Sequence, residues 1–155
     1  MKKLLLSLVL AGMATSATAQ EVPFMNMSDA NKCAVGSTFG DEGNTFFGYG
    51  KERGKPAAFI VGNDLWDIAP GDDLGVIVLE NADGEAITYT KAIAGEGGFR
   101  LVTSVNDIKR LLDNDTVGVR VVRDGVEIAR LNLPSTPSGR GLTYFNDCLA
   151  MRSDF

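Results

Sequence analysis

Residues 75–80 read Gly-Val-Ile-Val-Leu-Glu, with apolar side chains at consecutive rather than alternate positions. Such a run predicts a central strand covered on both faces, and it is the best candidate for the core. A turn at Asn81-Ala82-Asp83-Gly84 follows, after which Ile87 and Tyr89 alternate with threonines within residues 85–92. This alternation predicts a half-buried strand that pairs with the first.

Short strands separated by turn residues are expected on both sides of this pair. Asp124-Gly125 gives the strongest hairpin signal, because the dipeptide accepts the positive φ of a type I′ turn. The spacing indicates an antiparallel meander or sandwich and disfavours a parallel sheet with crossover helices. The further strands are expected at residues 32–38, 45–51, 56–61, 65–68, 99–103, 116–122 and 126–133.

The last hairpin predicts an irregularity in its second strand. Apolar residues change from even positions after the turn to odd positions from Ala129 onward. Because a slip of one residue moves every side chain to the opposite face, we expect a β-bulge close to Ala129-Arg130. The bulge would bring Leu131 opposite Val119 and turn Arg130 to solvent.

Two short helices complete the expected fold. Ser104 and Asp107 resemble a capping box that opens a helix ending near Asp113. Near the C-terminus, Leu142, Phe145 and Leu149 share one helical face, with Cys148 at its flank. We therefore expect a mainly β (α+β) fold, an antiparallel β sandwich or partly open barrel with two short helices, the C-terminal one packed on the sheet.

The N-terminus has the three parts of a secretory signal peptide. Lys2 and Lys3 precede the apolar stretch 4–12, and Ala17-Thr18-Ala19 forms an A-x-A cleavage site. The apolar stretch is shorter than the roughly 20 residues that a membrane span requires, so no membrane insertion is expected after cleavage. The expected organisation is a signal peptide at 1–19, an extended arm at 20–30 and a single β-rich domain at 31–155.

Cys33 and Cys148 are the two cysteines of the chain. A chain exported to an oxidising compartment is expected to pair them, whereas the alternative of two free thiols for redox or metal chemistry lacks C-x-x-C spacing. The disulfide and the signal peptide together predict a periplasmic or secreted protein.

Charge and composition narrow the functional classes. The chain carries 15 basic and 20 acidic residues, and removal of Lys2 and Lys3 with the signal peptide leaves a formal charge of −7. Such a surface disfavours nucleic acid and anionic membranes as partners. The chain contains no histidine, so triads and proton shuttles based on imidazole are excluded, and no catalytic residue or enzymatic activity is expected.

The acidic residues around Trp66 leave one catalytic alternative, a carboxylate pair of the kind that glycosidases use. We expect these acids to lie in solvated turns instead, because aspartate is mostly exposed. They are Asp64, Asp67, Asp72 and Asp73.

No cofactor or metal site is expected, although two weak patterns leave the matter open. Asp113-Asn114-Asp115 and residues 81–85 do not continue into a full calcium-binding loop. Met25 and Met27 offer two thioethers to Cu(I), or else form an adaptable apolar arm.

One candidate binding surface follows from the sequence Phe46-Phe47-Gly48-Tyr49-Gly50-Lys51. Phe47 and Tyr49 share one strand face, while the opposite face is nearly bare backbone. The two rings either belong to the core or form a recognition surface. In the second case the surface includes Lys51, Arg53 and Trp66, with the basic residues as rim contacts for an acidic partner.

The order of elements resembles that of small secreted proteins of Gram-negative bacteria. Cys33, Trp66, the strand Leu131-Asn132-Leu133 and the helical segment 142–148 carry the resemblance, which is to the invasion-associated locus B-like group and its uncharacterised periplasmic relatives. It spans about residues 31–150 in order of elements and few matching residues. Residues 134–141 depart from it, since a shorter link is expected there. The resemblance implies a periplasmic or surface-associated accessory protein and supplies no catalytic residues.

These observations favour a non-enzymatic exported envelope binding or accessory protein. Its partner is expected to be a protein or another envelope component, and the oligomeric state is left open. The alternative is a secreted inhibitor of a hydrolase, a lysozyme or a protease, which would insert a rigid loop or helix into the target's cleft.

Overall fold

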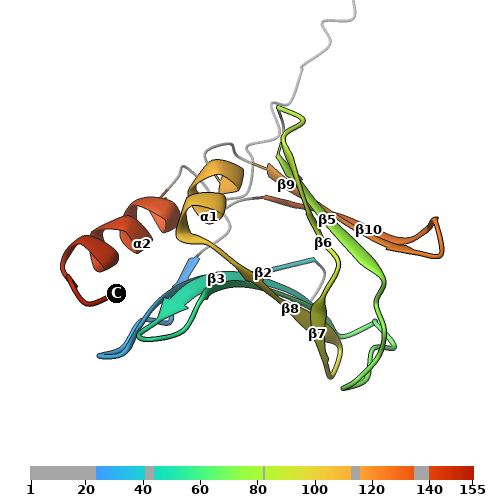
Figure 1. The fold of residues 1–155 in the computed structure, drawn as a ribbon, viewed down its shortest axis with the longest axis horizontal. Helices are drawn as coiled ribbons and strands as arrows, with labels where there is room; N and C mark the ends of the chain where they lie inside the picture. Colours follow the sequence, from blue (N-terminus) through green and yellow to red (C-terminus); the bar gives the residue numbers. More distant parts are fainter. Residues whose placement is uncertain (1–23, 41–43, 82, 113–115, 135–139) are drawn as a thin grey trace, which may run out of the picture.

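The computed structural model describes residues 24–40, 44–81, 83–112, 116–134 and 140–155 (Figure 1). The expected signal peptide and the Asp113-Asn114-Asp115 turn lie outside these residues. Residues 24–26 of the expected arm form an edge strand.

Ten strands form two separate antiparallel sheets. The six-stranded sheet has the order β1-β2-β3-β4-β8-β7 and the four-stranded sheet the order β10-β9-β5-β6. The strands are β1 (Phe24–Asn26), β2 (Lys32–Phe39), β3 (Thr45–Glu52), β4 (Ala57–Asn63), β5 (Val76–Asn81), β6 (Ala86–Tyr89), β7 (Ala92–Gly95), β8 (Gly98–Thr103), β9 (Thr116–Arg123) and β10 (Val126–Pro134).

Two helices lie on the same side of the six-stranded sheet as the four-stranded sheet does (Figure 1). Helix α1 (Val105–Leu112) packs against β5 and β9, and α2 (Arg140–Ala150) packs against β2. The expected mainly β fold with two short helices, the last one laid on a sheet, is confirmed. Neither helix is long and apolar enough to cross a membrane.

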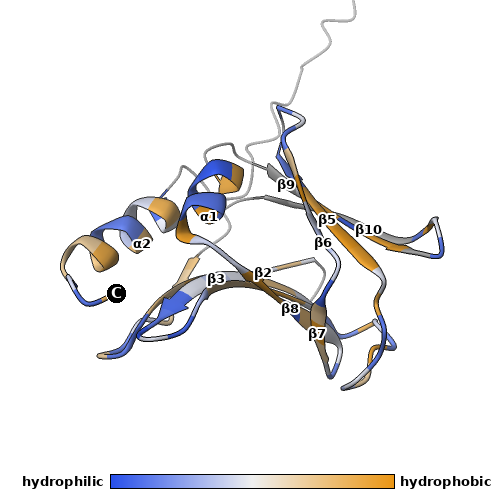
Figure 2. Ribbon diagram, viewed as in Figure 1, coloured by the Kyte–Doolittle hydropathy of each residue, from blue (hydrophilic) through white to orange (hydrophobic). Residues whose placement is uncertain are grey.

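The core fills the space between the two sheets and the helices. Tyr49, Phe59 and Phe145 are among its largest fully buried side chains, and the ring of Phe145 meets that of Tyr49 edge-on at 5.4 Å between centroids. Figure 2 shows apolar residues on the strands and the helix faces that line this space. The predicted disulfide is present, joining Cys33 in β2 to Cys148 in α2 with a Cα–Cα distance of 5.9 Å.

Strand β5 is not covered on both faces, as its sequence predicts, but on one. Ile77 and Leu79 are fully buried, but Val76, Val78 and Glu80 on the other side are only half-buried. The consecutive apolar residues therefore cover one core face and one partly exposed face, because no described layer packs on the outside of the four-stranded sheet. The expected pairing with Ile87 and Tyr89 is confirmed, since Leu79 lies opposite Ile87 and Ile77 opposite Tyr89.

The last hairpin contains the predicted bulge one residue earlier than expected. The register shifts between Glu127 and Ala129, and Leu131 lies opposite Val119 as predicted. Asp124 and Gly125 both have positive φ, as a type I′ turn requires.

Two local expectations are wrong. Residues 65–68 form no strand, because Trp66 N bonds the Asn63 carbonyl in a turn instead of continuing a ladder. Residues 85–92 were expected as one strand but divide between β6 and β7, which belong to different sheets.

Candidate functional site

The six-stranded sheet has one face in the core and one face that no described element covers. We call the second the outer sheet face. Its residues align across the strands in three rows and, at one end, in the charged pair of Lys32 with Glu52, as the pairing registers show. The rows are Thr38-Phe46-Gly62-Gly98-Gly95, Met25-Gly36-Gly48-Ile60-Arg100-Ile93 and Ala34-Gly50-Ala58-Val102.

The outer sheet face exposes an unusual amount of apolar side chain. Met25, Ile60, Ile93 and Val102 are 40%, 42%, 57% and 45% exposed, and all four lie on it. Single exposed apolar residues are ordinary on a protein surface, whereas a contiguous apolar patch marks an interaction site or an aggregation hazard.

The outside of the four-stranded sheet provides a contrast within the same molecule. There Arg120 in β9 forms an ion pair of 3.1 Å with Glu80 in β5, and Thr88 in β6 is exposed. That face also carries the half-buried residues Val76, Val78 and Val122, so it combines polar and apolar side chains. The outer sheet face differs from it in that four of its large apolar side chains are 40% exposed or more.

Glycines at the centre of the outer sheet face leave room above the backbone for the ring of Phe46. The ring of Phe46 extends from β3 across its own strand and β2, and a Cβ on Gly36 or Gly48 would lie 2.8 Å from ring atoms of Phe46. These two glycines therefore allow the ring to lie flat on the sheet. Gly62 carries no such cover, since a Cβ there would have only ordinary contacts.

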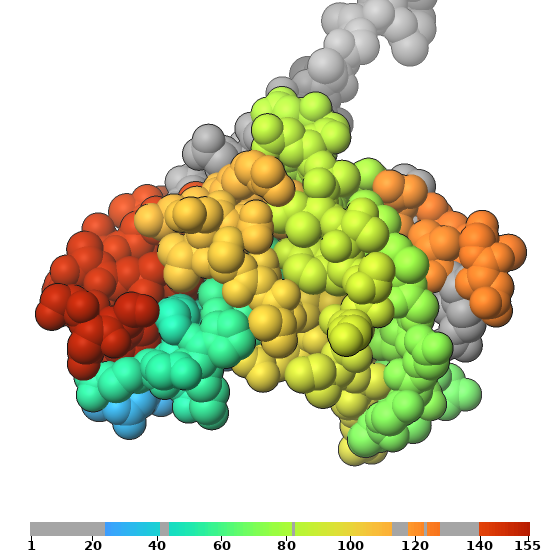
Figure 3. Space-filling model, viewed as in Figure 1, coloured from blue at the N-terminus to red at the C-terminus, as the bar shows by residue number. Residues whose placement is uncertain are grey.

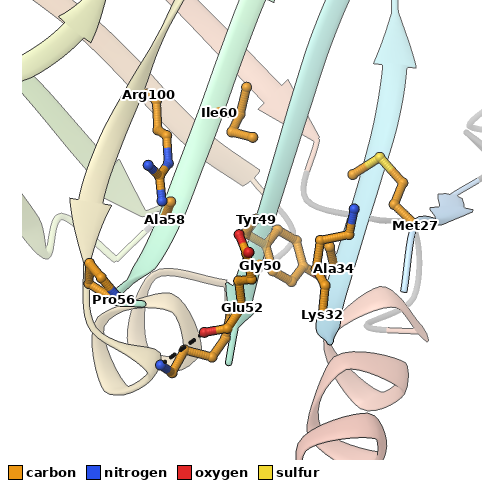
Figure 4. Close-up of a pocket in the computed structure, with 11 residues that line it drawn as sticks. Met27, Lys32, Ala34, Tyr49, Gly50, Glu52, Pro56, Ala58, Ile60 and Arg100 are labelled. Atoms are coloured by element: carbon orange, nitrogen blue, oxygen red, sulfur yellow. Dashed lines mark hydrogen bonds between the residues drawn. The ribbon is translucent and has the colours of Figure 1, made fainter. Parts of the chain in front are cut away.

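A pocket of about 150 Å³ opens on this face (Figure 4). Ala34, Gly50 and Ala58 belong to one row of the sheet and supply small residues to its lining. Figure 4 shows Arg100 and Ile60 on one side of the pocket and Met27 on the other. In Figure 3 the lower outline of the molecule is hollowed between β1–β4 and the segment that follows β4.

Arg100 is the one charged residue in the three rows. It lies directly opposite Ile60 in β4 and Ile93 in β7. No ion pair or hydrogen bond joins its guanidinium to any described side chain. The face thus offers a partly buried cation, flanked by apolar side chains, that has no carboxylate of its own.

The charges at the pocket's rim are, in contrast, already engaged. Lys32 pairs with Asp29 at 3.7 Å, and Glu52 pairs with Lys55 at 2.8 Å. The ammonium of Lys51 donates to the backbone carbonyls of Glu52, at 3.3 Å, and of Lys55. Within the part of the chain that the structure describes, Arg100 is therefore the cation on this face that no carboxylate or carbonyl engages.

The surface expected from the sequence is divided by the structure. Phe47 and Tyr49 are each 2% exposed, so they belong to the core. Arg53 pairs with Asp154 at 2.8 Å and lies over the ring of Phe155, while Trp66 stacks on Phe99 with 5.8 Å between ring centroids. Of the five residues, Tyr49 and Lys51 line the pocket, and the exposed face is the one that the sequence predicted to be nearly bare backbone.

The acidic residues of the segment after β4 are exposed, as expected. Asp64, Asp67, Asp72 and Asp73 form no described ion pair, and two of them stabilise turns. Asp72 accepts a hydrogen bond from Ala69 N at 2.8 Å and Asp73 one from Gly75 N at 2.9 Å. Asp67, Asp72 and Asp73 also line one pocket together with Asp124, and Asp64 and Asp67 line another with Trp66.

The two metal patterns differ in what the structure shows of them. In the turn after β5, Asn81 Oδ1 accepts from the backbone N–H groups of Asp83 and Glu85. Met25 lies on the outer sheet face, and Met27 lines its pocket. The described residues contain no group of three His, Cys, Asp or Glu side chains arranged to hold a metal ion.

Sequence reasoning missed Arg100 and the three rows. The available signal was the set of glycines placed between core residues, as in Phe47-Gly48-Tyr49-Gly50 and Val61-Gly62. Each such glycine is on the outer parity of its strand, and together they mark one sheet face. No known protein family, curated protein or solved structure matches this chain.

Proposed function

We propose that this chain is an exported, non-enzymatic envelope protein that binds a partner through the outer sheet face. The observation that carries the proposal is the set of four exposed apolar side chains on one sheet face, which also holds a pocket that Ile60 lines, while the other face of the sheet is core. Leaving such a patch in water has a cost in solubility, which a partner that covers it would remove.

Export is supported by two independent features. The first residues have the pattern of a signal peptide, and the Cys33–Cys148 disulfide requires an oxidising compartment to persist. The test is to express the full chain in a Gram-negative host and to fractionate the cells. We expect a product lacking residues 1–19 in the periplasm or the medium, and an unprocessed cytoplasmic product with free thiols would contradict the proposal.

Photocrosslinking in the intact envelope tests where binding takes place. A photoreactive residue is placed at Ile60 or Val102 on the outer sheet face, and at Val126, which is 62% exposed in the last hairpin, as a matched control. We expect one defined crosslinked product from the first two positions and none from Val126. Crosslinking that does not depend on the position would contradict binding through this face.

A specific observation favours the second candidate, a hydrolase inhibitor. The segment between β4 and β5 is held by the stacking of Trp66 on Phe99 and by hydrogen bonds from Trp66 N to the Asn63 carbonyl and from Gly97 N to that of Ile68. It presents Leu65, which is 78% exposed. A rigid loop with an exposed apolar residue is the kind of element that fills an enzyme's cleft.

The inhibitor candidate has its own test. Purified protein is titrated against a lysozyme and a serine protease, with a Leu65→Ala variant as the matched control. Stoichiometric inhibition that Leu65→Ala weakens would support this candidate. Crosslinking to the target enzyme from a photoreactive residue at position 65 would also support it. Absence of inhibition at micromolar protein leaves the first proposal in place.

A further inference from the structure

We propose that the outer sheet face recognises a polypeptide segment that presents a carboxylate next to an apolar side chain, with the carboxylate on Arg100 and the apolar side chain in the neighbouring pocket. This inference rests on the proposed function and adds the chemistry of the partner. It concerns one occupant, an acidic and apolar stretch of another protein.

The charge of the face argues for an anionic group. Arg100 lies between Ile60 and Ile93 and has no described acidic partner. A partner that covered these apolar residues would also take the guanidinium out of water, which is costly unless a carboxylate meets it. A carboxylate matches the planar guanidinium with two parallel hydrogen bonds, so the arginine selects for it.

The size of the pocket argues for a side chain. Its volume is about 150 Å³, similar to an engineered protein cavity of about 150 Å³ that binds benzene. Drug-sized ligands occupy pockets of roughly 300 Å³ or more. One aromatic or branched aliphatic side chain of a partner therefore fits in it.

A second copy of the chain is a less favourable occupant of the outer sheet face. In a two-fold symmetric dimer the same surfaces meet, so the outer sheet face of one protomer would bring its unpaired Arg100 to the same cationic face of the other. The three rows hold no carboxylate, and Glu52 at the end of this face is already paired with Lys55. Like charges in a desolvated interface are unfavourable.

An anionic lipid surface is the less suitable source of the anion. The chain has a formal charge of −5, which repels an anionic bilayer at long range. A docking segment meets only the local surface around Arg100. Gly62 and Gly98 lie beside that residue on the same face and carry no side chain, so an extended backbone can approach the sheet closely there.

The test is a selection from a display library of random short peptides on the full disulfide-bonded protein. Wild type is compared with Arg100→Glu, and with Lys109→Glu as a matched charge reversal on the exposed side of α1. We expect wild type and Lys109→Glu to enrich peptides that pair Asp or Glu with a large apolar residue. Arg100→Glu should instead enrich peptides that pair Lys or Arg with the apolar residue.

Affinity measurements on the best selected peptide complete the test. Arg100→Gln is expected to weaken binding about tenfold, the effect of losing a hydrogen-bonded charge. Gly62→Val fills the uncovered part of the face and should abolish binding without unfolding the protein, because a Cβ at Gly62 has room. Ile60→Lys is a second variant with the same expected loss, in case Gly62→Val unfolds.

The outcomes separate the two proposals. Enrichment of apolar peptides without acids, lost in Gly62→Val but unchanged in Arg100→Glu, would overturn the inference and keep the proposed face. Enrichment that neither variant changes would contradict both. Cosedimentation with phosphatidylglycerol vesicles without peptide binding, or a concentration-dependent dimer that Gly62→Val abolishes, would overturn the polypeptide as occupant.

Discussion

At the scale of single residues, the glycines of the outer sheet face have different reasons to be there. Gly62 and Gly98 are directly paired on neighbouring strands, yet their surroundings are unlike. A Cβ at Gly62 would have ordinary contacts, the nearest 3.6 Å from the Gly97 carbonyl oxygen. A Cβ at Gly98 would overlap the Val61 carbonyl oxygen and lie 2.8 Å from Gly62 Cα. Packing therefore explains Gly98, whereas no close contact among the described residues requires a glycine at position 62.

This difference gives a paired prediction. Gly62→Ala should leave the free energy of unfolding unchanged or raise it by about 0.4–1 kcal/mol, because alanine restricts the unfolded chain. Gly98→Ala should lower it by about 1–3 kcal/mol, because backbone must move. Urea denaturation of both variants measures the difference, and equal losses would show that the two positions are equivalent.

Tyr89 carries the pH dependence that the structure predicts. Its hydroxyl lies 2.9 Å from Thr103 Oγ1 and links the four-stranded sheet to the six-stranded one. Burial raises the pKa of Tyr89 above its ordinary value, although the hydrogen bond to Thr103 acts in the opposite direction. Below about pH 10 the phenol is neutral in both folded and unfolded chains, so its contribution is complete there. Above that pH the unfolded chain ionises first, and stability falls.

Tyr89→Phe should therefore lower the free energy of unfolding by about 1 kcal/mol at pH 7. The difference in free energy of unfolding between wild type and Tyr89→Phe should shrink as the pH rises above about 10, since phenylalanine cannot ionise. Thr103→Val is the matched control, because it removes the same hydrogen bond but keeps the alkaline fall. Denaturant titrations at pH 7 and at alkaline pH measure both effects, and parallel pH profiles for wild type and Tyr89→Phe would refute the explanation.

At this scale, the sequence predicts a residue's environment where neighbours along the same strand determine it, and not where neighbours from other strands do. The placement of Phe47 and Tyr49 on one parity could be predicted, because side chains alternate along a strand. Arg100 could not be recognised, because its neighbours Ile60 and Ile93 come from other strands. Only the register of three strands places its side chain between apolar residues on an exposed sheet face.

At the scale of elements, α1 begins where its capping residues predict. Ser104 Oγ accepts a hydrogen bond from Asp107 N at 3.0 Å and donates one to Asp107 Oδ2 at 2.8 Å. The buried residues Ile108, Leu111 and Leu112 then follow at helical spacing. A polar cap and an apolar face agree here, so the element could be placed from sequence alone.

Ser104→Ala should consequently lower the free energy of unfolding by about 1 kcal/mol. Asn106→Ala, in the same first turn and exposed, is the matched control and should have little effect. Chemical denaturation followed by circular dichroism measures both. A Ser104→Ala variant as stable as Asn106→Ala would show that the cap contributes nothing in this context.

Elements were missed where tertiary contacts override local pattern. Residues 65–68 combine Leu, Trp and Ile, yet they form a turn segment because Trp66 stacks on Phe99 in the six-stranded sheet. The change from β6 to β7 transfers the chain between sheets within residues 90–91. Neither event leaves a turn signal as strong as Asp124-Gly125, where the hairpin was placed correctly and its bulge to within one residue.

At the scale of the whole molecule, the two outer faces explain why the fold could be predicted and the site could not. Alternation and turns specify which residues point inward, and this requirement alone builds the core. The outer faces are free of it, so one carries a Glu80–Arg120 pair and the other an apolar surface. In both sheets the outward residues occupy alternate positions along the strands. Only the strand order shows which of these residues become neighbours.

The final prediction concerns the disulfide, which closes a chain segment of 115 residues. Loop-closure entropy predicts that its loss lowers the free energy of unfolding by at most about 4–5 kcal/mol. The loss should not be spread evenly, because α2 packs chiefly on β2, the strand to which Cys148 is joined. Beyond the disulfide, the buried ring of Phe145 holds the helix, while the Arg53–Asp154 pair after it is half-exposed and weak.

We therefore expect that Cys33→Ser combined with Cys148→Ser frees residues 140–150 for hydrogen exchange before either sheet opens. The outer sheet face should survive this change, because Cys33 points into the core and Ala34 beside it points to the pocket. Hydrogen exchange with mass spectrometry and the affinity of the selected peptide measure the two consequences on one sample. Simultaneous loss of protection in α2 and both sheets would show that the helix and the sandwich unfold as one unit, and that the disulfide stabilises the binding face as well.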